Sequence, residues 1–131
     1  MLPLLALVAM PALIAAPPAE LTPEALVQKQ VEAYNAHKLD AFVACYSPLI
    51  EFRTMDGKVG PEKGLAALRK GYGDLFKQFP TLHVQILNRI TQGAFVIDQE
   101  QAEGMGPNPI TVTAIYEIAE GKIIRVWFIE K

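Results

Sequence analysis

The feature that most restricts the fold is the pattern of the chain after Thr81. Four stretches of about ten residues, rich in Val, Ile, Thr and aromatic residues, follow one another here. Turn-forming residues at 91–93, 104–109 and 119–121 separate them. β-Branched and aromatic residues favour strands, and short breaks with Gly or Pro favour hairpins. The pattern therefore predicts an antiparallel meander of long strands.

Strand alternation predicts which side chains share a face of this sheet. Gly121 suits the left-handed third position of a three-residue loop, and the resulting register pairs Ile118 with Lys122, Tyr116 with Ile124 and Ala114 with Val126. The inner face is then expected to hold Leu82, Val84, Ile86, Asn88, Phe95, Ile97, Gln99, Val112, Ala114, Tyr116, Ile118, Ile124, Val126 and Phe128. It is almost free of charge, as a buried surface should be.

The polar residues between these positions are expected on the outer face, among them His83, Gln85 and Arg89. Asp98 and Glu100 are placed there too, in ion pairs with Arg89 or Arg125 across the sheet. A displacement of the alternation by one residue would instead turn both carboxyl groups inward, where they could act as acid and base.

Apolar side chains also lie on the predicted outer face, which makes it less polar than a solvated sheet surface. We therefore expect a homodimer that forms through this face, with these contact residues: Ile115, Ile123, Arg125 and Trp127.

Three helices are expected before the strands. Thr22 offers a capping hydroxyl just before Pro23 and Glu24, so the first helix begins there and ends near Asn35. A second short helix, ending near Pro48, is indicated by apolar residues at helical spacing: Leu39, Phe42, Val43 and Tyr46.

A short strand is expected at residues 50–54, with Phe52 and Thr54 inward and Glu51 and Arg53 outward. Turn signals at 56–57 and 60–61 follow it. The third helix comes next and ends at Pro80, and its apolar stripe consists of Leu65, Leu68, Tyr72, Leu75, Phe76 and Phe79.

The first 19 residues contain no charged side chain, so all charges fall on residues 20–131. An apolar run ending in Ala15 and Ala16 before two prolines is typical of a secretory signal peptide. We expect a signal peptide and Pro-rich linker at 1–19, one domain at 20–131, and a periplasmic or secreted protein whose only membrane contact is the export signal. An uncleaved anchor and a disordered or wrongly started tail remain alternatives.

Composition excludes several classes of function. The net charge is −2, and Lys and Arg are scattered singly, so the sequence offers no basic surface for nucleic acid. One cysteine and two histidines provide neither a disulfide nor the usual ligands of a zinc site, so no metal is expected. The glycine-rich segment 104–109 lacks the Lys-Ser/Thr of a phosphate loop. No cofactor is expected, and this segment is interpreted as a long hairpin loop that could cover a pocket.

Four segments in this order resemble the SnoaL-like branch of the nuclear transport factor 2-like superfamily, to which the ketosteroid isomerases belong. The segments are VEAYNAHKLDAFVACYSP, GPEKGLAALRKGYGDLFKQFP, LNRITQGAFVIDQE and AIYEIAEGKIIRVWFIE. The resemblance implies an α+β fold of the cystatin-like type, in which a cone-shaped curved antiparallel sheet wraps on three N-terminal helices. It also implies an apolar pocket inside the cone and, often, dimerisation through the outer sheet face.

The known chemistry of steroid isomerases does not carry over to this chain. Matching the motifs places Gln30, Thr54 and Ala114 where those enzymes have a catalytic tyrosine and two aspartates. Related hydrolases and dehydratases often have His where this chain has Gln99, and Gln cannot titrate. The catalytic residues are therefore left unknown.

The pocket is expected to hold a small apolar molecule, with core packing as the alternative role of its tyrosines. The predicted ligand-binding residues are Tyr34, Phe52, Thr54, Tyr72, Asn88, Gln99, Tyr116 and Phe128. Three functions stay open: a cofactor-independent isomerase, cyclase or lyase, a non-catalytic binding protein, or an interaction module that uses the outer face. His83 is placed outward, His37 in a helix–helix turn, and Cys45 in an inert buried position.

Overall fold

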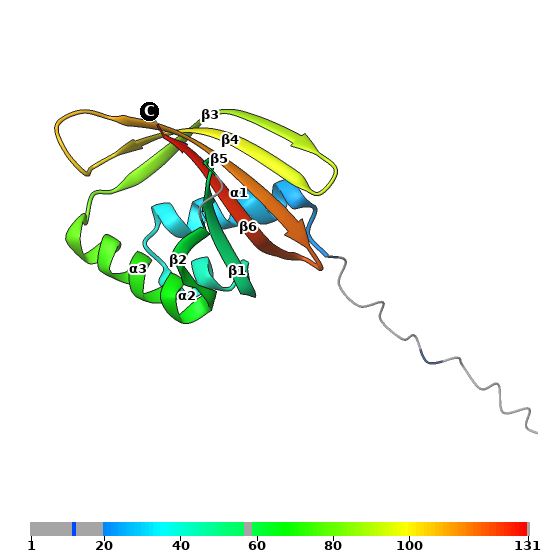
Figure 1. Ribbon diagram of the computed structural model, residues 1–131. Helices are drawn as coiled ribbons and strands as arrows, with labels where there is room; N and C mark the ends of the chain where they lie inside the picture. The colour runs from blue at the N-terminus through cyan, green and yellow to red at the C-terminus, as the bar shows by residue number, and fades with distance from the viewer. Residues whose placement is uncertain (1–11, 13–19, 57–58, 131) are drawn as a thin grey trace, which may run out of the picture.

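The computed structural model describes residues 12, 20–56 and 59–130. Its elements are the helices α1 (Pro23–Asn35), α2 (Leu39–Val43) and α3 (Gly64–Gln78), and the strands β1 (Tyr46–Thr54), β2 (Val59–Lys63), β3 (His83–Gln92), β4 (Phe95–Glu103), β5 (Ile110–Ala119) and β6 (Lys122–Glu130). One curved sheet contains all six of these strands in the order β2-β1-β6-β5-β4-β3, and the helices cover its inner face (Figure 1). The predicted α+β architecture and the meander from β3 to β6 are confirmed.

The first and third helices form where the sequence predicts them. The Thr22 hydroxyl accepts a hydrogen bond from the amide of Ala25 at 3.2 Å, and Pro23 occupies the first helical turn. Pro80 follows soon after the last residue of α3, as expected. None of the helices in the described part of the chain has the length and apolar character needed to cross a bilayer. The proposed leader lies outside the described residues, apart from Ala12.

The second helix is much shorter than predicted. It ends at Val43, and Tyr46 begins strand β1 instead of completing a helical stripe. The amide of Ile123 donates to the carbonyl of Cys45 at 3.0 Å, so this backbone already joins the sheet. β1 then runs parallel to β6, a long-range pairing that overrides the local helical spacing.

Two strands differ from the predicted faces: β3 beyond a bulge at Leu87, and β4 along its whole length, because β4 pairs with β5 in the opposite alternation. Ile86 pairs with Glu100 but Asn88 pairs with Gln99, so Leu87 is the extra residue and the alternation shifts beyond it. Along β4 the buried residues are Val96, Asp98, Glu100 and Ala102, not the predicted Phe95, Ile97 and Gln99. Asn88 and Gln99 therefore lie on the outer face, and Arg89 on the inner one.

The last hairpin also differs from the prediction. Glu120 and Gly121 both have positive φ, at 51° and 72°, which makes a two-residue turn and pairs Ala119 with Lys122. A bulge then lets Ile118 pair with Ile123 but Glu117 with Arg125. Ile123 is consequently fully buried inside the fold, and it cannot contribute to an outer contact surface.

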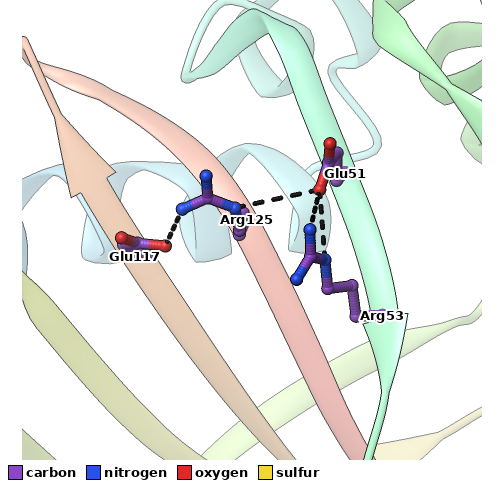
Figure 2. Close-up of polar contacts among 4 residues, drawn as sticks. All are labelled: Glu51, Arg53, Glu117 and Arg125. Atoms are coloured by element: carbon purple, nitrogen blue, oxygen red, sulfur yellow. Dashed lines mark hydrogen bonds and ion pairs between the residues drawn. The ribbon is translucent and has the colours of Figure 1, made fainter. Parts of the chain in front are cut away.

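The outer face combines an apolar row with a charged one. Cross-strand pairing aligns Ile90, Ile97, Ile115 and Trp127 from β3 to β6. Figure 2 shows the neighbouring charges, where Arg125 lies between Glu117 at 2.5 Å and Glu51 at 3.8 Å, and Arg53 contacts Glu51 at 2.6 Å. Arg53 and Glu51 thus face outward as predicted.

The β4–β5 loop makes a close backbone approach at Gly104, where φ is +98°. A Cβ atom there would lie 2.6 Å from the carbonyl oxygen of Thr81.

We expect Gly104→Ala to lower the free energy of unfolding by at least about 1–2 kcal/mol, because the alanine would be strained in the left-handed conformation and would overlap with the Thr81 backbone. Urea unfolding measures this. Gly106→Ala is the matched control, because a Cβ there meets none of the described atoms within 4 Å, and equal losses in the two variants would contradict the expectation.

Candidate functional site

A cavity of about 570 Å³ opens between α1, α3 and the inner face of the sheet. Most of its wall is apolar or aromatic. The described lining residues are Gln30, Val31, Tyr34, Tyr46, Phe52, Gly64, Ala67, Leu68, Gly71, Tyr72, Leu75, Val84, Glu100, Ala102, Met105, Val112, Tyr116, Phe128 and Glu130. A cavity of this size and character suits a small organic molecule.

The structure brings together five of the eight predicted ligand-binding residues: Tyr34, Phe52, Tyr72, Tyr116 and Phe128. Their role in binding stays a prediction. Thr54 is exposed near the end of β1, where its hydroxyl donates to Asp56, and it is not among the lining residues. Asn88 and Gln99 are exposed and paired with each other on the outer face, Asn88 because of the bulge at Leu87 and Gln99 because of the register between β4 and β5.

Two cavity residues, Glu100 and Gln30, were not among the predicted ligand-binding residues. Simple alternation places Glu100 outward, and only the alternation displaced by one residue, which the pairing with β5 establishes, turns this carboxyl group inward. The family resemblance identifies Gln30 only as the residue that stands where steroid isomerases have a catalytic tyrosine. Helical spacing could have found Gln30, since it lies four residues after Leu26 and four before Tyr34 on α1. No such signal exists for Glu100, because the two faces of β4 are about equally apolar.

Glu100 lies in the wall of the cavity and is only 8% exposed. The hydroxyl of Tyr116 donates to its Oε1 at 3.0 Å. Burial raises the pKa of Glu100 to about 7. The hydrogen bond from Tyr116 opposes this rise, the charge of Asp98 adds to it, and the charge of Arg89 opposes it. Near neutral pH this group can therefore both accept and donate a proton.

Asp98 lies next to Glu100 on the same face and is fully buried. Arg89 binds both of its oxygens, with Nε at 2.6 Å from Oδ1 and Nη2 at 2.8 Å from Oδ2. Its Nη1 donates to Gln28 on α1 at 2.9 Å. The predicted pairing of Asp98 with Arg89 is confirmed, although on the opposite face. This two-point contact neutralises Asp98 and leaves Glu100 as the carboxyl group of the deep cavity without a cationic partner among the described residues.

The tyrosines of the cavity keep their protons. Burial raises the pKa of Tyr34 to about 12, and the nearby charge of Glu100 adds to the effect. Burial likewise raises the pKa values of Tyr46, Tyr72 and Tyr116. Their hydroxyl groups therefore remain able to donate hydrogen bonds throughout the neutral range.

Gln30 projects from α1 into the same wall and is 5% exposed. Its Oε1 is buried and has no hydrogen-bond partner among the described residues. The Gln30 side chain also hydrogen-bonds with Tyr46, which opposes the rise in the pKa of that tyrosine. A buried acceptor without a partner is costly to stability.

The histidines and the cysteine lie outside the cavity lining. His37 occupies the turn between α1 and α2, stacks on Phe76 at 4.6 Å and contacts the carbonyl of Leu82 at 2.6 Å. His83 faces outward beside Glu103 at 3.4 Å. Cys45 is buried, though between α2 and β1 rather than on a helix, and burial raises the pKa of its thiol. The described residues contain no cluster of three His, Cys, Asp or Glu side chains suited to a metal ion.

Comparison with known proteins identifies the class. The family model of the SnoaL-like domain matches residues 27–126, and the chain therefore belongs to this family. No curated protein matches it. The fold is shared with nuclear transport factor 2-like and ketosteroid isomerase-like proteins of known structure.

Three solved structures illustrate this likeness. An uncharacterised cystatin-fold protein from Novosphingobium aromaticivorans is 24% identical, with a TM-score of 0.77 over 84% of this chain and 99% of that one. A nuclear transport factor 2-like protein of unknown function from Cytophaga hutchinsonii is 14% identical, with 0.71 over 86% and 93%. A protein with a ketosteroid isomerase-like fold from Catenulispora acidiphila, in complex with trimethylamine, is 14% identical, with 0.68 over 85% and 88%.

The raised pKa of Glu100 makes stability depend on pH. Between about pH 4.5 and 7 the folded protein keeps a proton at Glu100 that the unfolded chain releases, so folding stability falls as pH rises. We expect Glu100→Gln to remove this fall, which reaches roughly 3 kcal/mol. Urea unfolding of both proteins from pH 4.5 to 8 measures the difference.

Glu103→Gln is the control for this comparison, because it makes the same change on the same strand at a side chain that is 45% exposed. If the stability curves of the wild type and Glu100→Gln run parallel, the pKa of Glu100 is not raised by folding.

Proposed function

We propose that this protein binds a small, largely apolar molecule in the cavity and catalyses a proton transfer on it, with Glu100 as the general acid–base. The observation that carries the proposal is a carboxyl group with a pKa of about 7 in the wall of an aromatic cavity. A general base works best when its pKa lies near the working pH. Such chemistry fits an isomerase, cyclase or lyase.

The surroundings of Glu100 support this role. Tyr116 holds Oε1, which leaves Oε2 to meet the substrate. The hydroxyl groups of Tyr34, Tyr46 and Tyr72 line the same cavity and can stabilise negative charge that develops on the substrate. The complex of the Catenulispora protein with trimethylamine is a small-molecule complex on the same fold.

A general probe of base catalysis tests the proposal without knowledge of the substrate. 5-Nitrobenzisoxazole is a small aromatic molecule, and removal of its C3 proton breaks the N–O bond and releases a coloured cyanophenolate. Glu100 would take the proton and then return it to water. We expect a rate that rises with pH around a midpoint near 7, and a loss of at least about 100-fold in Glu100→Gln.

The control is again Glu103→Gln, which should keep the wild-type rate because its side chain lies outside the lining. Circular dichroism confirms that each variant is folded. Equal rates for the wild type and Glu100→Gln would refute base catalysis and leave the non-catalytic binding protein as the remaining function of the cavity.

We further propose that two copies assemble through the outer face, on the apolar row Ile90, Ile97, Ile115 and Trp127. Ile90 is 54% exposed, and large apolar patches on a surface favour association.

Trp127→Ala should weaken the dimer at least about tenfold, since central aromatic residues dominate interface energies. Leu49→Ala, at an 81% exposed site on β1, should leave it unchanged.

Native mass spectrometry across a dilution series measures this assembly. A wild-type chain that is monomeric at all concentrations would contradict it. In protein recovered from the exported fraction, a mass beginning near Pro17 would support the export that we propose from the N-terminal sequence.

A further inference from the structure

The charged side chains that the structure describes in the wall of the cavity are all acidic. Gln30 presents an acceptor oxygen without a partner among the described residues, and Glu100 presents a carboxyl group. Glu130, which lies in the same cross-strand row as Glu100, adds a second carboxyl group at an exposed position. No Lys, Arg or His is found among the described lining residues. Apart from the tyrosine hydroxyl groups, a bound ligand would therefore meet acceptors and negative charge, and no cationic side chain among the described lining residues.

The rest of the wall is rich in aromatic rings, and six of them line the cavity: Tyr34, Tyr46, Phe52, Tyr72, Tyr116 and Phe128. Several contact one another, as in the stacked pair Phe52 and Phe128 with ring centres 5.8 Å apart. The faces of aromatic rings carry partial negative charge and attract cations, most strongly where water is excluded. The rings and the carboxyl group thus favour the same kind of ligand.

We propose that the ligand is an organic ammonium ion, an apolar or aromatic body that carries a protonated amine whose N–H groups donate to Gln30 Oε1 and to the Glu100 carboxylate. This inference rests on the proposed function, because it names the substrate class of the same cavity. A neutral alcohol has one proton to donate, whereas an ammonium group donates to both acceptors and also neutralises the carboxylate. An ammonium group bound in this way places the ligand within reach of Glu100, the proposed acid–base.

Other charges around Glu100 do not already supply that neutralisation. Arg89 is bound to Asp98 through both carboxylate oxygens, at 2.6 Å and 2.8 Å. The titratable and charged groups that surround Glu100 come from every element of the cavity: Tyr34 on α1, Tyr46 on β1, Tyr72 on α3, Arg89 on β3, Asp98 on β4, Tyr116 on β5 and Glu130 on β6.

Calorimetric titration with phenethylamine and with 2-phenylethanol tests the proposal. The two probes have similar size and the same ring, and only the amine is charged from pH 5 to 8. The wild type should bind the amine at least tenfold more tightly than the alcohol at pH 8. Because a cation needs Glu100 ionised, its affinity should fall roughly 100-fold between pH 8 and pH 5, while the alcohol changes little.

Two variants test which residues cause the preference for the amine. Glu100→Gln should abolish the preference for the amine and its pH dependence but still bind the alcohol, and Gln30→Leu should weaken the amine more than the alcohol. Glu103→Gln should behave as the wild type. The pH series uses the wild-type protein, so it decides the question even if a cavity variant does not fold.

Equal or tighter binding of the alcohol at pH 8, or an amine affinity that does not change with pH, would overturn the ammonium proposal. The benzisoxazole reaction is independent of this result, because its probe is neutral. A Glu100-dependent rate together with no amine preference would reject the ammonium ligand and keep the proposed function. Equal rates for the wild type and Glu100→Gln would reject the proposed function itself.

Discussion

The polar interior of this protein depends on the ion pair between Arg89 and Asp98. Asp98 is fully buried, and a buried carboxylate is tolerated only when a cation and hydrogen bonds compensate it. The guanidinium supplies both through two short contacts and ties β3 and β4 to Gln28 of α1. With Asp98 neutralised, the acidity of the cavity is left to Glu100, two residues further along the strand.

The position of that ion pair is set by one extra residue. Without the bulge at Leu87, Arg89 would face outward, since Ile86 and Asn88 would share the inner face. The bulge brings Arg89 opposite Asp98 and moves Asn88 to the outer face, where it pairs with Gln99. The uncharged Asn88 is thus replaced opposite Asp98 by Arg89, whose charge compensates the buried carboxylate.

The sequence predicts the parts of this structure that depend on local signals. Thr22 and Pro23 identify the start of α1, Pro80 the end of α3, and the runs after Thr81 the four-strand meander. It also predicts that five aromatic residues meet in the cavity, because aromatic residues at strand or helix spacing keep a common face where no bulge intervenes. The shared fold of the family supplied the overall curvature and the expectation of a pocket.

Where prediction failed, the cause was long-range. The backbone at Cys45 leaves the helical path to pair with β6, and bulges in β3 and β6 shift the faces of Arg89 and Ile123. The faces of Asp98 and Glu100 are set by the register between β4 and β5, which places them opposite Ala114 and Val112. Period-two alternation contains no information on such shifts unless burial is known for each residue. Hydrophobicity alone also favours the wrong face of β4, since Phe95 and Ile97 are as apolar as Val96 and Ala102.

This failure has a chemical reason. A strand that turns two carboxyl groups inward has the same composition as a strand with a polar outer face, and β4 buries Asp98 and Glu100 in this way. The outer face in turn carries isoleucines and Trp127 where a solvated sheet would carry charge. Both departures from the simple hydrophobic pattern occur on β4 and its neighbours and lie on opposite faces of the sheet, one facing the proposed ligand cavity and one forming the proposed dimer surface. The residues that depart from the alternation of apolar and polar side chains are therefore the residues on which the proposed functions depend.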